Sequence, residues 1–311
     1  MRRSSIYGMF AAAVLLAGTV AACEAGGPQG VSAPDRALTA AQQDLEGTPD
    51  LVVDTQRMRN TWVVLNETFV EGQCSVEEGN IPTGNHRSLR FSVLINNIGD
   101  ADLYVGDPLA HMDPNGDGNF ADQDGLFEFA SCHAHFHFRN YAKYEILPRL
   151  PDGSLGTPVQ ARKRGFCMLD TTPRSNANAS PKGRYYTNCG NLTIHGNQGI
   201  STGFGDEYDR RLPGQLFLLS DPNEPVPPGD YVIRITANPP FVPQNGEVCP
   251  AVDGQGFCHM FVESDYTNNV GEIDVTIPAG VGHEGYGPGK GTFTGEALDA
   301  YHHPEAHANG H

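Results

Sequence analysis

Three histidines at alternate positions are the residues in this sequence best suited to chemistry. His133, His135 and His137 are separated by Ala134 and Phe136. Alternate side chains of a strand share one face, and the outer pair is roughly 13 Å apart along an extended backbone. A bend would bring the rings together around an ion. Imidazole suits zinc, copper, nickel and iron, so the spacing predicts a metal site without choosing the metal; the alternative is a polar strand face.

The chain around these histidines has the composition of short strands and turns. It holds 37 Gly and 23 Pro, and 18% of its residues are charged. We therefore predict a mainly β fold, a single β-sandwich-like domain with long loops over residues 49–278, stapled by disulfides. No long helix is expected. The expected strands cover residues 51–53, 61–65, 89–95, 141–147, 215–219, 231–236 and 271–277.

The N-terminus has the pattern of an export signal. Arg2 and Arg3 precede an apolar stretch that is short for a membrane span and ends in Ala21-Ala22-Cys23. This ending resembles a bacterial lipobox, which implies a lipoprotein signal peptide over residues 1–22 and a lipid on Cys23. The alternative is a plain secretory signal. Both place the protein outside the cytoplasm, and the first anchors it to the bacterial membrane or cell surface through the lipid only.

Two further segments lack apolar periodicity. Residues 23–48 are rich in Gly, Pro, Ala and Gln and are predicted to be a flexible tether. Residues 279–311 are Gly/His-rich and carry five of the 12 histidines. We predict a disordered low-complexity tail there; the alternative is a loose metal-binding segment.

Six cysteines remain after Cys23, an even number that predicts three disulfides in an oxidising compartment. Proximity along the chain favours Cys167–Cys189 and Cys249–Cys258, which leaves Cys74–Cys132. None of the spacings is Cys-x-x-Cys, so zinc bound by thiolates is not expected.

The formal net charge of −17 is strongly acidic. Such a chain repels nucleic acid, so no nucleic-acid partner is expected. It attracts cationic solutes, including amines and Lys-rich chains. The alternative is that the charge serves solubility alone.

The residues that flank the histidines resemble one known family. Residues 127–137, Phe-Glu-Phe-Ala-Ser-Cys-His-Ala-His-Phe-His, resemble the copper-binding segment of the lysyl oxidase family, Trp-Glu-Trp-His-Ser-Cys-His-Gln-His-Tyr-His. The resemblance implies that His133, His135 and His137 bind copper. Residues 141–147 are also similar to the family's following segment.

The same resemblance implies a cofactor made from the chain itself, lysine tyrosylquinone. Residues 161–171 are similar to the family segment that carries the cofactor Lys, which places Lys163 in that role. Residues 199–208 are similar to the segment that carries the cofactor Tyr, which places Tyr208 there. Without the family pattern both would be ordinary residues, Lys163 one of three clustered bases and Tyr208 one of 11 tyrosines.

A third similarity implies calcium. Residues 262–270, Val-Glu-Ser-Asp-Tyr-Thr-Asn-Asn-Val, resemble a family segment that holds calcium together with an N-terminal Asp-Leu pair. The alternative is the turn chemistry of a segment rich in Asp and Asn. The implied oxygen ligands, which suit Ca²⁺, come from Asp50, Leu51, Glu263, Asp265, Asn268 and Asn269.

A separate acidic loop fits the spacing of an EF-hand loop. Residues 113–124 place oxygen-bearing side chains at alternate positions and glycine at position 6. We predict a second calcium loop or, equally, a solvated acidic turn. The candidate ligands are Asp113, Asn115, Asp117, Asn119 and Asp124.

Residues and resemblance together predict a copper-dependent amine oxidase. It would convert primary amines, with peptidyl lysine as the expected substrate, to aldehydes with O2, releasing H2O2 and ammonia. One alternative is a non-catalytic copper-binding surface lipoprotein. Another is a calcium-stabilised adhesion module in which the histidines are incidental.

Overall fold

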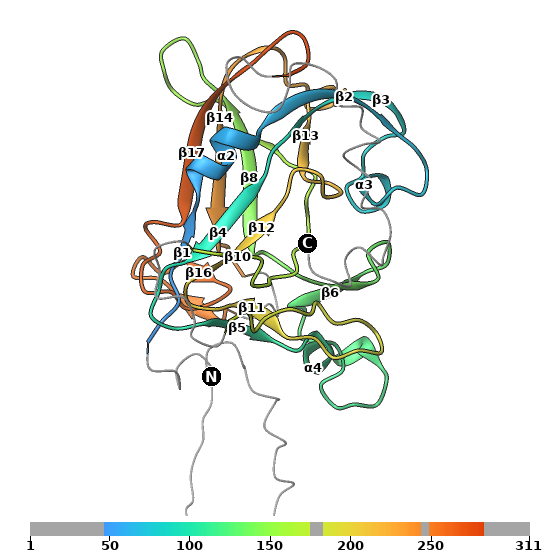
Figure 1. Ribbon diagram of the computed structural model, residues 1–311, viewed down its shortest axis with the longest axis vertical. Helices are drawn as coiled ribbons and strands as arrows, with labels where there is room; N and C mark the ends of the chain where they lie inside the picture. Colours follow the sequence, from blue (N-terminus) through green and yellow to red (C-terminus); the bar gives the residue numbers. More distant parts are fainter. Residues whose placement is uncertain (1–46, 175–182, 244–248, 283–311) are drawn as a thin grey trace, which may run out of the picture. The chain divides into compact units, whose positions relative to one another are not determined.

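Four antiparallel strands form the most regular sheet of the molecule. Its order is β17-β14-β8-β9, and its three long strands lie side by side in Figure 1. Every second residue of β17 is buried, as expected for a strand with one face on the core. The strands are β8 (Ala142–Pro148), β9 (Val159–Gln160), β14 (Gly229–Ala237) and β17 (Val270–Ile277).

A second four-stranded sheet and a three-stranded sheet complete the framework. Their orders are β1-β4-β12-β10 and β13-β3-β2, and β1 packs against β14 and β17. The strands are β1 (Leu51–Val53), β2 (Val63–Phe69), β3 (Gly84–Arg90), β4 (Val93–Asn97), β10 (Thr172–Pro173), β12 (Phe204–Tyr208) and β13 (Leu216–Leu218).

Short elements fill the long connections between these sheets. Three two-stranded sheets pair β5 (Leu103–Gly106) with β11 (Gln198–Ile200), β6 (Phe127–Ala130) with β7 (His135–Phe138), and β15 (Ala251–Val252) with β16 (Cys258–His259). The helices are short: α2 (Thr55–Thr61), α3 (Cys74–Glu77), α4 (Pro108–Met112) and a 3-10 turn, η1 (Phe120–Asp122).

This computed structural model describes residues 47–174, 183–243 and 249–282. The predicted signal peptide, the lipidated Cys23, all but the last two residues of the tether, and the tail from residue 283 lie outside these residues. At the C-terminal limit the Gly282 N–H donates to the Val64 carbonyl at 2.7 Å, so residues beyond β17 still contact β2.

Aromatic side chains join the sheets in the core. Phe91 stacks on Phe217 of β13 with ring centroids 4.9 Å apart, and meets Tyr144 of β8 edge-on at 5.7 Å. All three rings are buried, and such pairs add specific contacts to the area that they remove from water. The strands and sheets described above confirm the predicted mainly β fold.

The prediction of one continuous strand over residues 89–95 is wrong. The chain leaves one sheet at Arg90 and enters another at Val93, with Phe91 and Ser92 between them. The Ser92 N–H donates to the Thr61 hydroxyl, and the Ser92 hydroxyl accepts from the Arg210 N–H, both at 3.0 Å. Apolar alternation continues through such a change of sheet, so the pattern alone does not reveal it.

Three disulfides cross-link the loops. They join Cys74 to Cys132, Cys167 to Cys189 and Cys249 to Cys258, with Cα atoms 5.5, 5.5 and 5.4 Å apart. The second and third are the pairs that proximity along the chain favours, and the first is the pair that these two leave. Cys74–Cys132 is the long-range one and ties α3 to the turn between β6 and β7.

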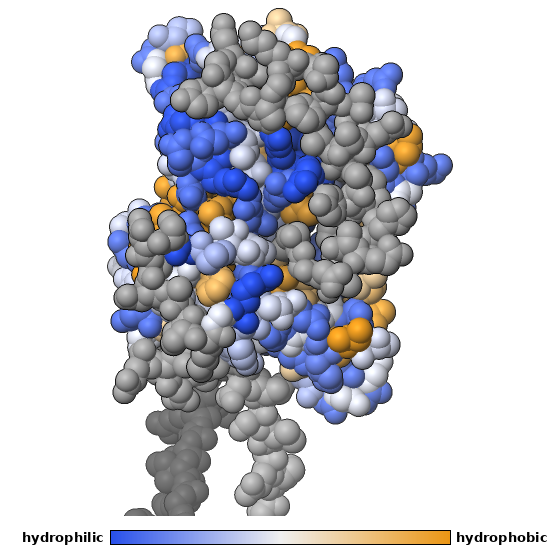
Figure 2. Space-filling view, in the orientation of Figure 1, coloured by the Kyte–Doolittle hydropathy of each residue, from blue (hydrophilic) through white to orange (hydrophobic). Residues whose placement is uncertain are grey.

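The coloured residues on the face drawn in Figure 2 are mainly polar. Hydrophobic side chains gather only in small separate patches among these coloured residues (Figure 2). No helix in the described ranges is long and apolar enough to cross a membrane.

Candidate active site

The three histidines lie on a tight hairpin rather than on one extended strand. β6 and β7 pair from Phe127↔Phe138 to Ala130↔His135, and residues 131–134 form the turn. Ala134 adopts a left-handed conformation with φ 55°, unusual for a residue that carries a Cβ. This turn is the bend that the spacing required, because it folds His133 back toward His135 and His137.

The hairpin brings the three imidazoles together in a buried place. Their exposed fractions are 5%, 8% and 4%, and one potential ligand atom from each lies within 4.8 Å of the others. His135 Nε2 and His137 Nε2 are 3.1 Å apart. Among the described residues, no other group of three His, Cys, Asp or Glu side chains meets so closely.

Glu78 joins this group, although no motif in the sequence predicts it as part of a site. Its Oε2 lies 2.8 Å from His133 Nδ1, and its Oε1 accepts from the Cys132 N–H at 3.1 Å. A carboxylate on Nδ1 orients the ring and directs Nε2 at a metal. Burial raises the pKa of Glu78, but contact with His133 and the charge of Lys163 outweigh burial, so the pKa lies below its ordinary value.

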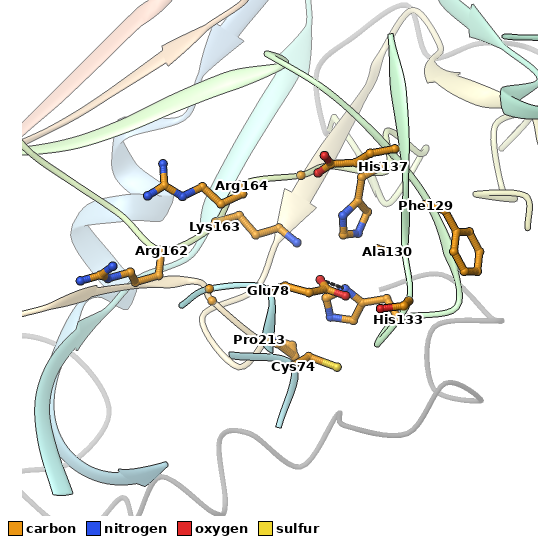
Figure 3. A pocket seen from close by; sticks show the side chains of 15 residues that line it. Cys74, Glu78, Phe129, Ala130, His133, His137, Arg162, Lys163, Arg164 and Pro213 are labelled. Carbon is orange, nitrogen blue, oxygen red and sulfur yellow. Dashed lines mark ion pairs between the residues drawn. The ribbon is translucent and has the colours of Figure 1, made fainter. Parts of the chain in front are cut away.

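A segment of irregular backbone carries Lys163 to the histidines. The Arg162 N–H donates to the Leu216 carbonyl at 2.9 Å, and Phe166 pairs with Phe138 of β7 in a β-bridge. The Arg162 guanidinium also binds Asp221. Both ends of the segment are therefore fixed to strands, and Figure 3 shows the Lys163 amine directed toward His133 and His137.

Lys163 and Tyr208, which are 45 positions apart in the sequence, are neighbours in the structure. The Lys163 Nζ lies 5.4 Å from the centroid of the Tyr208 ring. Its side chain is half-buried, and desolvation of its amine lowers the pKa to about 8, although Glu78 and Asp206 act in the opposite direction. A substantial part of Lys163 is therefore a neutral nucleophile near pH 8.

Tyr208 is the last residue of β12 and has no exposed surface. Its hydroxyl donates to the Cys167 carbonyl at 2.8 Å, and its ring meets Phe166 edge-on with centroids 5.1 Å apart. Burial and the negative charge of Asp206 raise its pKa well above the ordinary value. Tyr208 is thus held as a neutral phenol in a fixed orientation.

A cavity opens onto this group of residues. It has a volume of ≈230 Å³ and is lined by Glu78, Glu128, His133, His137 and Lys163, among others. A small hollow of ≈10 Å³ lies between the three histidines, Lys163, Cys167 and the Leu212–Pro213 turn. The hollow is about the size of one small ion or one water molecule.

The oxygen-bearing residues expected to hold calcium also come together, at the junction of β1 with the C-terminal strands. Glu263 accepts from the Leu51 N–H at 2.6 Å and from the side-chain amides of Asn238 and Asn269, each at 2.8 Å. The Asn268 amide donates to Asp50 at 2.9 Å. Hydrogen bonds thus occupy these carboxylates, while Asp265 accepts from Thr267. The calcium assignment stays a prediction.

The acidic loop over residues 113–124 is organised by turns. The Asp113 carboxylate accepts from the backbone of Asp117 at 3.0 Å and of Gly118 at 2.8 Å. Asp124, the twelfth position, binds His111 Nδ1 at 2.5 Å. The side chains of Asn115, Asp117 and Asn119 each accept a hydrogen bond from the backbone N–H two residues further along the chain. This geometry suits both a solvated acidic turn and a calcium loop, and the second stays a prediction.

Comparison with known proteins places this site in a family. The model of the lysyl oxidase family matches residues 49–247. Lysyl oxidase homolog 2 of Pongo abelii is 28% identical over 238 residues, which are 72% of this chain and 24% of that protein. The Homo sapiens homolog 2 is 27% identical over the same length. Lysyl oxidase homolog 4 of Bos taurus is 27% identical over 258 residues, or 80% of this chain and 28% of that protein.

The chain thus spans about a quarter of the length of these relatives. The family match covers most of the described β-framework, from β1 through β14, and includes the histidine hairpin, Lys163 and Tyr208. On the strength of that match, the chain belongs to the lysyl oxidase family.

Proposed function

We propose that this protein is a copper- and quinone-dependent amine oxidase of primary amines, with peptidyl lysine as the expected substrate. The observation that carries the proposal is the meeting of two independent groups in one buried place. The histidine hairpin supplies a metal-binding set, and the Lys163–Tyr208 pair lies beside it.

The donor set fits copper. Imidazole nitrogens suit Cu²⁺, and the cysteines of the described domain form disulfides. The nitrogens lie within 4.8 Å of each other, so small ring rotations would close them on one ion. Glu78 would hold His133 in the required orientation.

The Lys163–Tyr208 pair fits a lysine tyrosylquinone. An amine with a pKa of about 8 faces the ring of a tyrosine with no exposed surface. The 5.4 Å between Nζ and the ring centroid is short enough for a modest side-chain movement to bring the amine to the ring edge.

Copper and the quinone, once in place, would supply the oxidising chemistry, in which one amine, one O2 and one water give one aldehyde, one ammonia and one H2O2. The residues of the chain supply position and electrostatics. Glu78 and Glu128 line the cavity, and their carboxylates would attract the substrate ammonium. The net charge of −17 favours the approach of Lys-rich chains in the same way.

We further propose that the protein works outside the cytoplasm, anchored through a lipid on Cys23. Three disulfides in the described domain support an oxidising compartment. Calcium at the Glu263 site belongs to the same proposal, supported by the Asn268 and Asn269 amide oxygens, which are buried without a partner among the described residues.

One experiment tests the enzyme assignment. Purified protein loaded with Cu²⁺ in air should develop a visible quinone band, form an adduct with phenylhydrazine and release peroxide from amines or lysyl peptides. Tyr208→Phe should remove the band while copper still binds. Tyr185→Phe is the matched control, because Tyr185 is 54% exposed, and should keep it.

Two outcomes would count against the proposal. A fully copper-loaded protein without colour would leave the non-catalytic copper-binding lipoprotein as the function. Stoichiometric copper in His135→Ala would contradict the metal assignment itself.

A further inference from the structure

Behind Lys163 and Tyr208 lies a group of buried polar side chains that the proposed function does not use. The hydroxyls of Tyr141 and Tyr144, both carboxylate oxygens of Asp206 and both amide atoms of Gln215 make no well-aligned hydrogen bond to the described residues. Leaving a buried polar atom unpaired typically costs about 1–3 kcal/mol. So many in one place indicate a role in chemistry rather than in stability.

Asp206 stands at the centre of this group. It has no exposed surface, and its charge is the strongest charge acting on Tyr141, on Tyr144 and on Tyr208. The rings surround Phe166, whose centroid is 5.4 Å from those of Tyr141 and Tyr144 and 5.1 Å from that of Tyr208.

Strand β12 explains why Asp206 faces Tyr208. The two residues are separated by one position, so their side chains share the inner face of the strand. The carboxylate lies beside the Tyr208 hydroxyl, but that hydroxyl makes its well-aligned hydrogen bond to the Cys167 carbonyl. A small rotation of the hydroxyl would redirect its proton to Asp206.

We propose that Asp206 is the proton acceptor for the Tyr208 hydroxyl while the quinone cofactor is built, an inference that rests on the proposed function. In this step the O–H bond of Tyr208 breaks and an O–H bond forms on Asp206, with no change in the number of electrons on either side chain. The net charge of the buried group stays the same. Because adding a charge to such an interior is costly, a proton can leave Tyr208 readily only to a partner of this kind.

The surroundings support this role. Burial raises the pKa of Asp206 well above its ordinary value, Asp170 acts in the same direction, and Tyr208, the Leu169 N–H and Lys163 oppose the rise only in part. The carboxylate is therefore a stronger base than an exposed one. The titratable groups that face it are Tyr208 on the same strand, Tyr141 and Tyr144 on β8, Lys163 before Phe166, and Asp170 after Leu169.

The test follows cofactor formation rather than turnover. Metal-free full-length protein and its Asp206→Asn variant receive Cu²⁺ in air at a series of pH values. The appearance of the quinone band and of the linked Lys163 and Tyr208 peptides, by mass spectrometry, gives the rate. We expect both proteins to bind copper equally and the variant to form the quinone roughly 100-fold more slowly. Its rate should continue to rise with pH where the wild-type rate levels off, because hydroxide replaces the missing base.

The matched control is Glu207→Gln, the next residue of β12, whose carboxylate binds Arg57 on the other face of the strand. It should form the quinone at the wild-type rate. Lys163 titrates in all these proteins, so the difference between variant and wild type isolates Asp206.

Every other result of these experiments either contradicts the inference or supports it. Equal rates and pH profiles in Asp206→Asn and wild type would overturn it while leaving the proposed function intact. A copper-loaded wild type without quinone would overturn the proposed function and the inference together. If Asp206→Asn does not fold, Asp206→Glu decides: an altered pH profile of quinone formation supports the role of Asp206, and an unaltered profile refutes it.

Discussion

At the scale of single residues, the site depends on how closely the Lys163 segment approaches the histidine hairpin. Gly165 lies against the His137 ring, and a Cβ at this position would stand 2.3 Å from His137 Nδ1 and 2.6 Å from His137 Cβ. Non-bonded carbon and nitrogen atoms do not pack that closely, so a methyl group must displace the ring. The absence of a side chain at Gly165 therefore fixes the place of a proposed copper ligand.

Gly165→Ala should weaken copper binding by roughly 10–100-fold, the range seen when groups that orient metal ligands are changed. The fold should persist, because the change affects one ring. Competition with a copper chelator measures the affinity and thermal denaturation measures the fold. Gly254→Ala is the control, since a Cβ there would meet nothing within 4 Å; equal copper affinity in the two variants would refute the explanation.

At the scale of elements, a buried ion pair locks the edge of the site. Glu67 of β2 and Arg90 of β3 are 0–1% exposed in their side chains and lie 2.8 Å apart. Arg90 also donates to the carbonyls of Arg210 and Leu212, at 3.0 and 3.1 Å. These bonds fix the turn after β12 that borders the hollow beside Lys163.

Glu67→Ala should lower the free energy of unfolding by about 3–5 kcal/mol, because it leaves the Arg90 charge buried without its partner. Urea denaturation measures the loss. Glu272→Ala breaks the exposed pair with Arg234 and should cost less than about 1 kcal/mol. Similar losses in both variants would mean that the buried pair contributes no more to the free energy of unfolding than the exposed pair.

A second prediction at this scale concerns Glu263, which joins β1 to the strands at the other end of the chain. Burial raises its pKa from 4.5 to about 7, although hydrogen bonds from Asn238, Leu51 and Asn269 oppose the rise. A carboxyl whose pKa is higher in the folded state stabilises fully below pH 4.5 and loses that contribution as the pH rises through 7. The loss is about 3 kcal/mol.

Without calcium, the wild type should therefore lose stability relative to Glu263→Gln between pH 5 and pH 8. Calcium should restore stability at pH 8 and have little effect at pH 5, because it binds the ionised form. Thermal denaturation with calcium or with a chelator measures both. A calcium effect that is equal at the two pH values, or survives in Glu263→Gln, would exclude this residue as a ligand.

Local patterns in the sequence predicted part of this arrangement. His133, His135 and His137 stand close together in the chain, and alternation with turn residues predicted a mainly β fold. Lys163 and Tyr208 could be named only through resemblance, because nothing in their own spacing relates them. Glu78, Gly165 and Asp206 were not predicted as parts of the site. Each of these residues acts through a contact with another element or through its burial. A run of neighbouring residues in the sequence reveals neither the contact nor the burial.

At the scale of the whole molecule, the disulfides differ in what they hold. Cys74–Cys132 spans 58 residues and joins α3, next to Glu78, to the turn that carries His133. Cys249–Cys258 spans 9 residues and closes a loop around β15 and β16. Closing the longer loop removes more entropy from the unfolded chain, so the first bond should contribute about 4 kcal/mol and the second about 2.5 kcal/mol.

Replacing both cysteines of each pair by alanine should therefore produce two different proteins. Cys74→Ala with Cys132→Ala should lose more stability and also bind copper more weakly, because no covalent bond then joins the helix next to Glu78 to the turn beside His133. Cys249→Ala with Cys258→Ala should lose less stability and keep its copper affinity. Denaturant titration and copper competition on both variants measure these effects. Copper affinity unchanged in the first variant would show that the hydrogen bonds of Glu78 alone hold the site together.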